Sequence, residues 1–165
     1  MRLFAAIAPP QETLDRIEQI QKAVHREVRQ KGSYPHRDKL HITLKFWGEE
    51  LSLPTVKMLI EESLVGAAKI PILLDSLDGF PAHSRLKRVA FLNIAQPEPL
   101  IKIMRAMGEP EPHPHLTLAR YMQHAELPRL KFEPIAFDAE SVILYDSIQF
   151  GADRRYVIQG QWPLM

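Results

Sequence analysis

Two tetrapeptides of the same pattern carry the clearest chemistry in this sequence: His-Ile-Thr-Leu at residues 41–44 and His-Leu-Thr-Leu at residues 115–118. Each lies in a segment that alternates like a β-strand, in which side chains at i and i+2 point to the same face. Each tetrapeptide therefore puts an imidazole and a hydroxyl side by side. Imidazoles transfer protons near neutral pH, and hydroxyls donate hydrogen bonds to anionic oxygens. Two such pairs indicate acid–base chemistry at a phosphate.

His41 and His115 are the predicted acid–base pair, and Thr43 and Thr117 are the predicted hydrogen-bond donors to the phosphate oxygens. Two of the chain's four threonines lie two residues after a histidine, which chance rarely produces among seven histidines and 165 residues. The sequence leaves open which histidine is the base and which is the acid.

Two cations lie close to the motifs. Lys45 alternates onto the face of His41, where it would add positive charge. Arg120 lies five residues after His115, so strict alternation puts it on the opposite face. A twist or a bulge at the strand end would turn Arg120 back towards the phosphate.

Three neighbouring residues have competing interpretations. His113 and His115 have the spacing of a metal-ligand pair, but Pro114 favours an extended lead into the strand and no carboxylate lies close on that face. We therefore expect no metal and assign His113 a positioning or structural role. Phe46 alternates onto the apolar face and is expected in the core. Trp47 falls on the histidine face, where packing is favoured over stacking on a nucleobase.

The composition is that of an ordinary globular domain, with 45% hydrophobic residues, 25% charged residues and a formal net charge of +1. The chain has no cysteine, which excludes disulfides, thiolate metal sites and cysteine nucleophiles. No segment is apolar for long enough to cross a bilayer, and the first ten residues do not match a secretory signal. We expect a soluble cytoplasmic protein, monomeric and without an obligate protein partner.

The predicted elements follow from hydrophobic periodicity and turn residues. Gly32 is expected to end the first helix. Strands are predicted over 2–8, 40–48, 70–77, 87–94, 115–121, 135–150 and 154–162, and helices over 13–30, 54–68 and 97–107. This order predicts an α+β fold, with two largely antiparallel sheets that carry outer helices and face each other across a central cleft. Residues 1–165 would form a single domain of two lobes, each contributing one His and one Thr.

The sequence resembles the 2H phosphoesterase superfamily, whose mark is two His-x-Thr-x motifs, and within it the RNA 2',3'-cyclic phosphodiesterases, also called 2'-5' RNA ligases. The stretch between Ile94 and His113 is shorter than is usual in that family. The resemblance otherwise runs nearly end to end, through Arg2–Ile7, Leu40–Gly48, Gly79–Pro81, Arg88–Val89, His113–Arg120, Leu144–Ser147 and Arg155–Val157.

The resemblance implies hydrolysis of RNA 2',3'-cyclic phosphate ends to 2'-phosphates, without metal or cofactor, and a phosphate contact at Arg120. The reverse reaction would join RNA ends through a 2'-5' linkage without ATP. Other cyclic or 2'-5' substrates stay open, among them ADP-ribose 1'',2''-cyclic phosphate and 2'-5' oligoadenylates. So do a non-catalytic RNA-binding module, in which the histidines only hold phosphate, and a metallohydrolase that uses His113 and His115.

Overall fold

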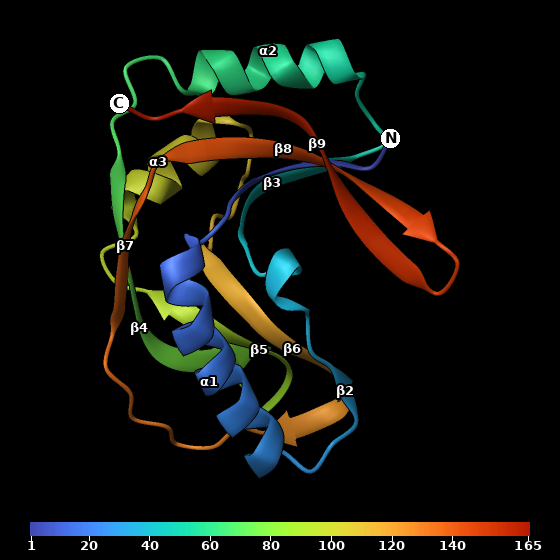
Figure 1. Cartoon of the computed structure of the whole chain (residues 1–165), viewed down its shortest axis with the longest axis vertical. Coiled ribbons are helices and arrows are strands. Elements are labelled where there is room, and N and C mark those ends of the chain that lie inside the picture. The colour runs from blue at the N-terminus through green and yellow to red at the C-terminus, as the bar shows by residue number, and fades with distance from the viewer.

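Nine strands and three α-helices make up the chain, and every strand pair is antiparallel (Figure 1). The structure is a computed structural model that describes all residues, 1–165. In chain order the elements are β1 (Leu3–Ile7), α1 (Gln11–Glu27), β2 (Gly32–Ser33), the 3-10 turn η1 (Arg37–Lys39), β3 (Ile42–Gly48), α2 (Leu53–Ser63), β4 (Ile70–Phe80), β5 (Leu86–Ile94), α3 (Glu98–Ala106), β6 (His115–Glu126), β7 (Ile135–Ala139), β8 (Ser141–Phe150) and β9 (Asp153–Pro163).

The strands form one sheet in the order β7-β4-β5-β6-β3-β1-β8-β9, with β2 paired to β6. Its two halves, β7-β4-β5-β6 and β3-β1-β8-β9, meet at a single residue pair, Ile42 opposite Leu116. The predicted α+β class and antiparallel pairing are confirmed, but the prediction of two separate sheets is corrected. Ile42 and Leu116 are the apolar residues inside the two motifs, and both are fully buried. Burying them together draws the two motif strands into contact, and pairing satisfies backbone groups that water cannot reach.

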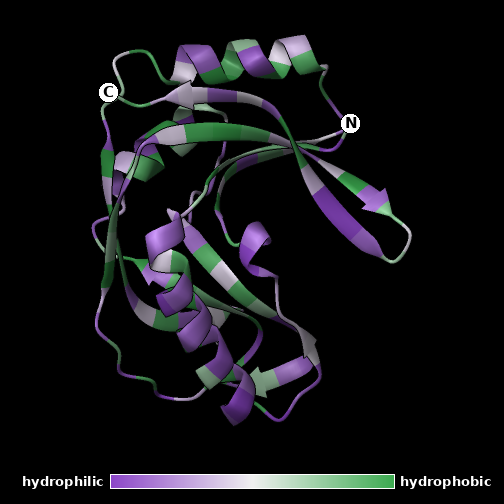
Figure 2. Cartoon of the chain, in the orientation of Figure 1, coloured by the Kyte–Doolittle hydropathy of each residue, from purple (hydrophilic) through white to green (hydrophobic).

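One apolar core runs through both halves of the sheet and comprises 35 buried residues. Helix α1 packs against β7, α2 against β1 and α3 against β3. Figure 2 shows hydrophobic residues along the central strands and hydrophilic residues on the outer side of α1. The buried stripe of that helix contains the residues that its periodicity predicted, Leu14, Ile17, Ile20 and Val24. None of the helices has the length and apolar character needed to cross a membrane.

Several element boundaries differ from the prediction. Helix α2 ends at Ser63 rather than at residue 68, whereas β4 and β6 extend to Phe80 and Glu126 rather than to residues 77 and 121. Helix α1 ends at Glu27, because Val28 adopts an extended backbone and is buried in the core. Gly32 therefore does not end the helix and lies in β2. The strand predicted over 135–150 is two strands, since the burial pattern changes phase at Glu140. Strand β7 pairs with β4 in one half of the sheet, and β8 pairs with β1 in the other.

Gly79 in β4 is required by close packing beside the turn that follows. A Cβ at this position would lie 2.3 Å from the Val89 carbonyl oxygen and 2.9 Å from Cγ of Lys87. We expect Gly79→Ala to lower the free energy of unfolding by roughly 3 kcal/mol or more, measured by urea denaturation. The control is Gly66→Ala, where φ is +73° but no atom lies within 4 Å, so that only about 1–2 kcal/mol of backbone strain is expected. Equal losses in the two variants would contradict the close approach at Gly79.

Candidate active site

The two motifs start side by side in the centre of the sheet. His41 precedes β3 by one residue, and His115 begins β6. The antiparallel pair between Ile42 and Leu116 lies immediately after each histidine. Continued in the same register, the pairing places each histidine opposite the threonine of the other motif and on the same face as it. Two imidazoles and two hydroxyls thus gather on one face.

Both histidines are held in the same orientation by a backbone carbonyl two residues earlier. Nδ1 of His41 is 2.6 Å from the Lys39 carbonyl oxygen, and Nδ1 of His115 is 2.6 Å from that of His113. A carbonyl only accepts hydrogen bonds, so Nδ1 carries the proton and donates it. In the neutral ring, Nε2 is then the nitrogen that can take up a proton. Thr43 donates its hydroxyl hydrogen to Nε2 of His41 at 2.9 Å.

Burial lowers the pKa of both imidazoles below the ordinary value of 6.5. The carbonyls of Lys39 and His113 partly oppose this by favouring protonated rings. Nearby positive charge lowers the pKa further: His115 and Arg120 act on His41, and His113 and Arg120 act on His115. The free site therefore holds two neutral imidazoles at pH 7, each ready to accept a proton at Nε2.

These lowered pKa values predict a loss of stability in acid. Between the folded-state pKa and 6.5, the unfolded chain binds more protons than the folded protein. The free energy of unfolding therefore falls as the pH drops from above 6.5 through the folded-state pKa. We expect urea denaturation to give a lower free energy of unfolding near pH 5.5 than near pH 7.5. The difference should shrink when both His41→Gln and His115→Gln are introduced, and an unchanged difference would contradict this assignment.

A β-bulge in β3 decides which side chains after the motif share its face. Two consecutive residues of β1 pair with Thr43 and Lys45, so Leu44 has no partner. Consecutive residues of a strand point to opposite faces, so Lys45 lies on the face opposite Thr43. Its ammonium is 3.3 Å from the carbonyl oxygen of Gly108. The prediction that Lys45 shares the face of His41 is therefore wrong.

The same bulge brings Phe46 to the motif face. Phe46 pairs with Phe4, whose ring centroid lies 6.5 Å from that of Phe46 and 5.2 Å from that of His41. Phe46 is 48% exposed, whereas Trp47 is 6% exposed and belongs to the core. The packing role of Trp47 is confirmed, and the prediction that Phe46 lies in the core is wrong. Alternation alone cannot reveal an exposed aromatic residue created by one extra residue in a strand.

Strand β6 has a bulge at the corresponding residue. Two consecutive residues of β5 pair with Thr117 and Ala119, so Leu118 has no partner. Arg120 thereby returns to the motif face, where its positive charge lowers the pKa of both histidines. The bulge that the sequence required for Arg120 is present. Phe46 and Arg120 each follow their histidine by five residues, so they take corresponding positions in the two strands.

Two aromatic rings flank each histidine. His113 also lies in this group, with its ring centroid 5.8 Å from that of His115. The chain contains no cluster of three or more His, Cys, Asp or Glu side chains arranged to hold a metal ion. By centroid distance the flanking rings are Phe4 (5.2 Å) and Tyr156 (5.5 Å) for His41, and Phe91 (4.8 Å) and Phe80 (5.1 Å) for His115.

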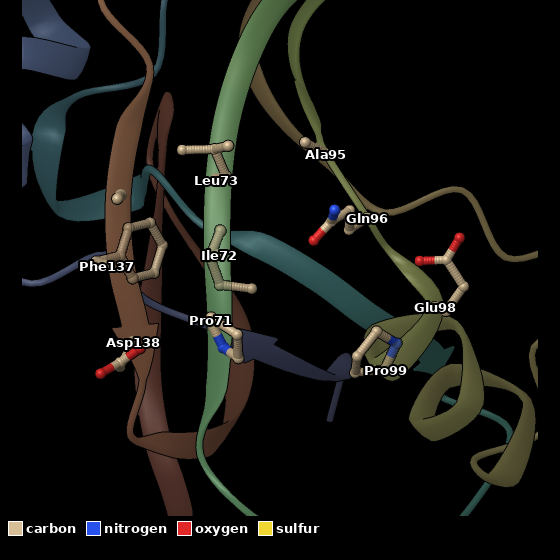
Figure 3. Close-up of a pocket in the computed structure, with 10 residues that line it drawn as sticks. Pro71, Ile72, Leu73, Ala95, Gln96, Glu98, Pro99, Phe137 and Asp138 are labelled. Carbon is tan, nitrogen blue, oxygen red and sulfur yellow. The ribbon is translucent and has the colours of Figure 1, made fainter.

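A large surface hollow lies outside this group of residues. It has a volume of about 860 Å³ and lies between β4, β7 and the start of α3 (Figure 3). Leu73, Gln96 and Phe137 are among the residues that line it, and it contains neither motif. The site is thus defined by its side chains on the open face of the sheet rather than by this hollow.

Comparisons with known proteins agree with the geometry. A family described as the 2'-5' RNA ligase superfamily matches residues 9–148. The comparison with curated protein sequences gave no match. Similar solved structures are those of E. coli LigT complexed with phosphate (25% identity, TM-score 0.76, 99% of this chain and 96% of that one) and with 3'-AMP (25%, 0.76, 99% and 97%). The protein TT0787 of Thermus thermophilus shares the fold, at 23% identity and a TM-score of 0.76 over 99% and 98% of the two chains.

Proposed function

Because the chain belongs to the 2'-5' RNA ligase superfamily of 2H phosphoesterases, we propose that it hydrolyses the 2',3'-cyclic phosphate at the end of an RNA strand to a 2'-phosphate. One observation carries the proposal: two histidines on one face each have Nδ1 bonded to a backbone carbonyl, so that Nε2 is the nitrogen that can accept a proton, and the charge of Arg120 acts on both. LigT has been solved with phosphate and with 3'-AMP, which is a nucleotide with its phosphate on the ribose. A site for a ribose phosphate in this chain is consistent with both.

The reaction opens a five-membered phosphodiester ring by in-line attack of water. One imidazole takes a proton from the water through Nε2 as the new P–O bond forms. The other imidazole, protonated, gives its proton to the ribose oxygen as the P–O3' bond breaks. The bound phosphate is anionic, so it offsets the charge of Arg120 and favours protonation of one ring in the complex. The two histidines fill both proton-transfer roles, and the proposed reaction needs no metal ion.

Negative charge develops on the two non-bridging oxygens during this step. Thr43 and Thr117 lie on the same face as the histidines and would donate hydrogen bonds to those oxygens. Thr43 donates to Nε2 of His41 in the free protein, so its hydroxyl must turn to the phosphate when substrate binds. Arg120 adds a planar donor that suits two phosphate oxygens at once. Lys45 is left out of the proposed contacts, because it lies on the other face.

The same groups would support ring opening by an alcohol in place of water. A 5'-hydroxyl would give its proton to one imidazole as its oxygen bonds to phosphorus, and the P–O3' bond would break as the other imidazole protonates the 3'-oxygen, which leaves a 2'-5' linkage. The energy comes from the strained cyclic phosphate, so ATP is not consumed. This step would join two RNA ends, and the family is named for such a 2'-5' ligation.

Phe46 would support the nucleobase of the terminal nucleotide. Its exposed ring lies on the motif face next to the ring of Phe4, which in turn lies next to that of His41. Base–aromatic stacking contributes about 1–3 kcal/mol, so Phe46→Ala should lower kcat/KM by roughly 5- to 150-fold. Phe46→Tyr keeps the ring and should stay within about twofold of the wild type. Phe150→Ala, which removes another half-exposed ring, is the matched control.

The proposal is tested with a short RNA that ends in a 2',3'-cyclic phosphate, in the presence of excess EDTA. Ring opening to a 2'-phosphate is the expected result. Loss of activity in EDTA would overturn the metal-free mechanism and favour a site at His113 and His115. Binding of the RNA without turnover would indicate a phosphate-binding module. If ADP-ribose 1'',2''-cyclic phosphate were turned over and the RNA were not, the two-histidine mechanism would stand and the proposed RNA substrate would be wrong.

A further inference from the structure

The end of the β8–β9 hairpin projects from the rest of the sheet as an arm (Figure 1). Strand β8 pairs with β1 as far as Asp146, and the amide of Ser147 donates to the carbonyl oxygen of Arg2 at 2.9 Å. Residues 148–150 pair with residues 153–155 of β9 alone. We call residues 147–156 the arm. At its base, the ring centroid of Tyr156 lies 5.5 Å from that of His41. The arm therefore starts at the proposed reaction site and extends away from it.

Arg154 lies on the arm face that continues from the reaction site. It precedes Tyr156 by two residues in β9, so both side chains point to the same face. Nη1 of Arg154 donates to the carbonyl oxygen of Ser147 at 2.9 Å and to its hydroxyl at 3.1 Å. Ser147 is buried and pairs with Tyr156 across the hairpin. The guanidinium is thus turned back towards the base of the arm and held there.

The charge of Arg154 is available to a ligand. Asp153 is the one acidic residue of the arm, and its carboxylate is 2.7 Å from the ammonium of Lys39. Arg154 itself forms no ion pair with a carboxylate; its side chain bonds only to Ser147. A guanidinium has five N–H donors in a planar fork, so the groups not used at Ser147 remain free to bind an anion such as a phosphodiester.

We propose that Arg154 binds the phosphodiester that joins the terminal nucleotide to its neighbour. Two residues of strand separate Arg154 from Tyr156, about 6.6 Å, which is comparable with one nucleotide step of an extended strand. The substrate would then be an RNA strand rather than a free nucleotide, since a mononucleotide has no such phosphodiester. This inference rests on the proposed function and adds that the preferred substrate has more than one nucleotide.

The test compares 2',3'-cyclic AMP with a trinucleotide that ends in a 2',3'-cyclic phosphate. Arg154→Gln should lower kcat/KM for the trinucleotide about tenfold and leave that for the mononucleotide within about twofold. Arg155→Gln is the matched control: it removes the same charge from the next residue, which lies on the opposite face with its guanidinium 4.7 Å from the centre of the Phe150 ring. Arg155→Gln should leave both substrates within about twofold.

Four results would overturn the proposal. An equal loss on both substrates would show that Arg154 only supports the hairpin, and an unchanged trinucleotide rate would show that it makes no contact. A loss of the same size in Arg155→Gln would show a general charge effect. If the wild type turned over neither substrate, the proposed function would be wrong. The contact of Arg154 would still be tested by measuring the binding of a trinucleotide with a 3'-phosphate. A plot of the logarithm of the association constant against the logarithm of the salt concentration has a negative slope. In Arg154→Gln this slope should be less steep by about 0.7, and an unchanged slope would overturn the contact.

Discussion

His41→Ala and His115→Ala are each expected to lower kcat for opening a terminal 2',3'-cyclic phosphate by about 10³-fold or more. Each variant removes one of the two proton transfers, and general acid–base catalysis contributes roughly 10²- to 10⁴-fold per group. The two losses should not multiply in the double variant, because the histidines act in one concerted displacement. The measurement is single-turnover hydrolysis of the trinucleotide in excess EDTA.

The matched control is His83→Ala, which removes an imidazole from the exposed turn between β4 and β5. It should leave kcat within about twofold of the wild type, as expected for an exposed side chain outside both His-x-Thr motifs. Binding of the product should survive in both active-site variants, because Thr43, Thr117 and Arg120 remain. Full activity in either His41→Ala or His115→Ala would contradict the two-histidine mechanism.

Arg120→Ala is expected to lower kcat/KM by roughly 10²- to 10³-fold, the usual loss when a donor to a developing oxyanion is removed. A second effect follows from the electrostatics of the site. The charge of Arg120 lowers the pKa of both His41 and His115, so its removal raises both values. The pH profile of kcat/KM should therefore move to higher pH in this variant.

Arg120→Lys separates the two effects of Arg120. Lysine keeps the positive charge, so the pH profile should stay close to that of the wild type. It lacks the planar fork that binds two phosphate oxygens, so much of the loss in kcat/KM should remain. A normal rate in Arg120→Ala would show that the bulge at Leu118 does not bring this side chain to the phosphate. A loss without a change of pH profile would show that its charge does not reach the histidines.

The sequence predicted those features that depend on local pattern. Periodicity indicated the buried stripe of α1 and most of the strands, because a helix and a strand each repeat their faces at a set interval. The His-x-Thr spacing placed His41 with Thr43, and His115 with Thr117, on common faces, since residues i and i+2 share a face in any regular strand. The family follows from the same motifs, and the match over residues 9–148 confirms it.

The partner strands decided what comes after each motif. One residue without a partner, Leu44 in β3 or Leu118 in β6, reverses the faces of the residues that follow it, up to the next shift of register in its strand. For this reason Lys45 lies on the face opposite the site, whereas Phe46 and Arg120 lie on the same face as the motif histidines. A bulge is defined by the register against a neighbouring strand, so no count along a single strand reveals it.

Tertiary structure also decided how the two halves meet. By itself the sequence determined two strands that each carry a histidine and a threonine on one face, and the α+β class, because these depend on residue types and short-range spacing. Their union in one sheet through Ile42 and Leu116, and the arm that carries Arg154 beyond His41, depend on contacts between residues far apart in the chain. Such contacts form where apolar side chains are buried and buried backbone groups find hydrogen-bond partners at the same time. Both conditions depend on the whole fold and not on any one segment.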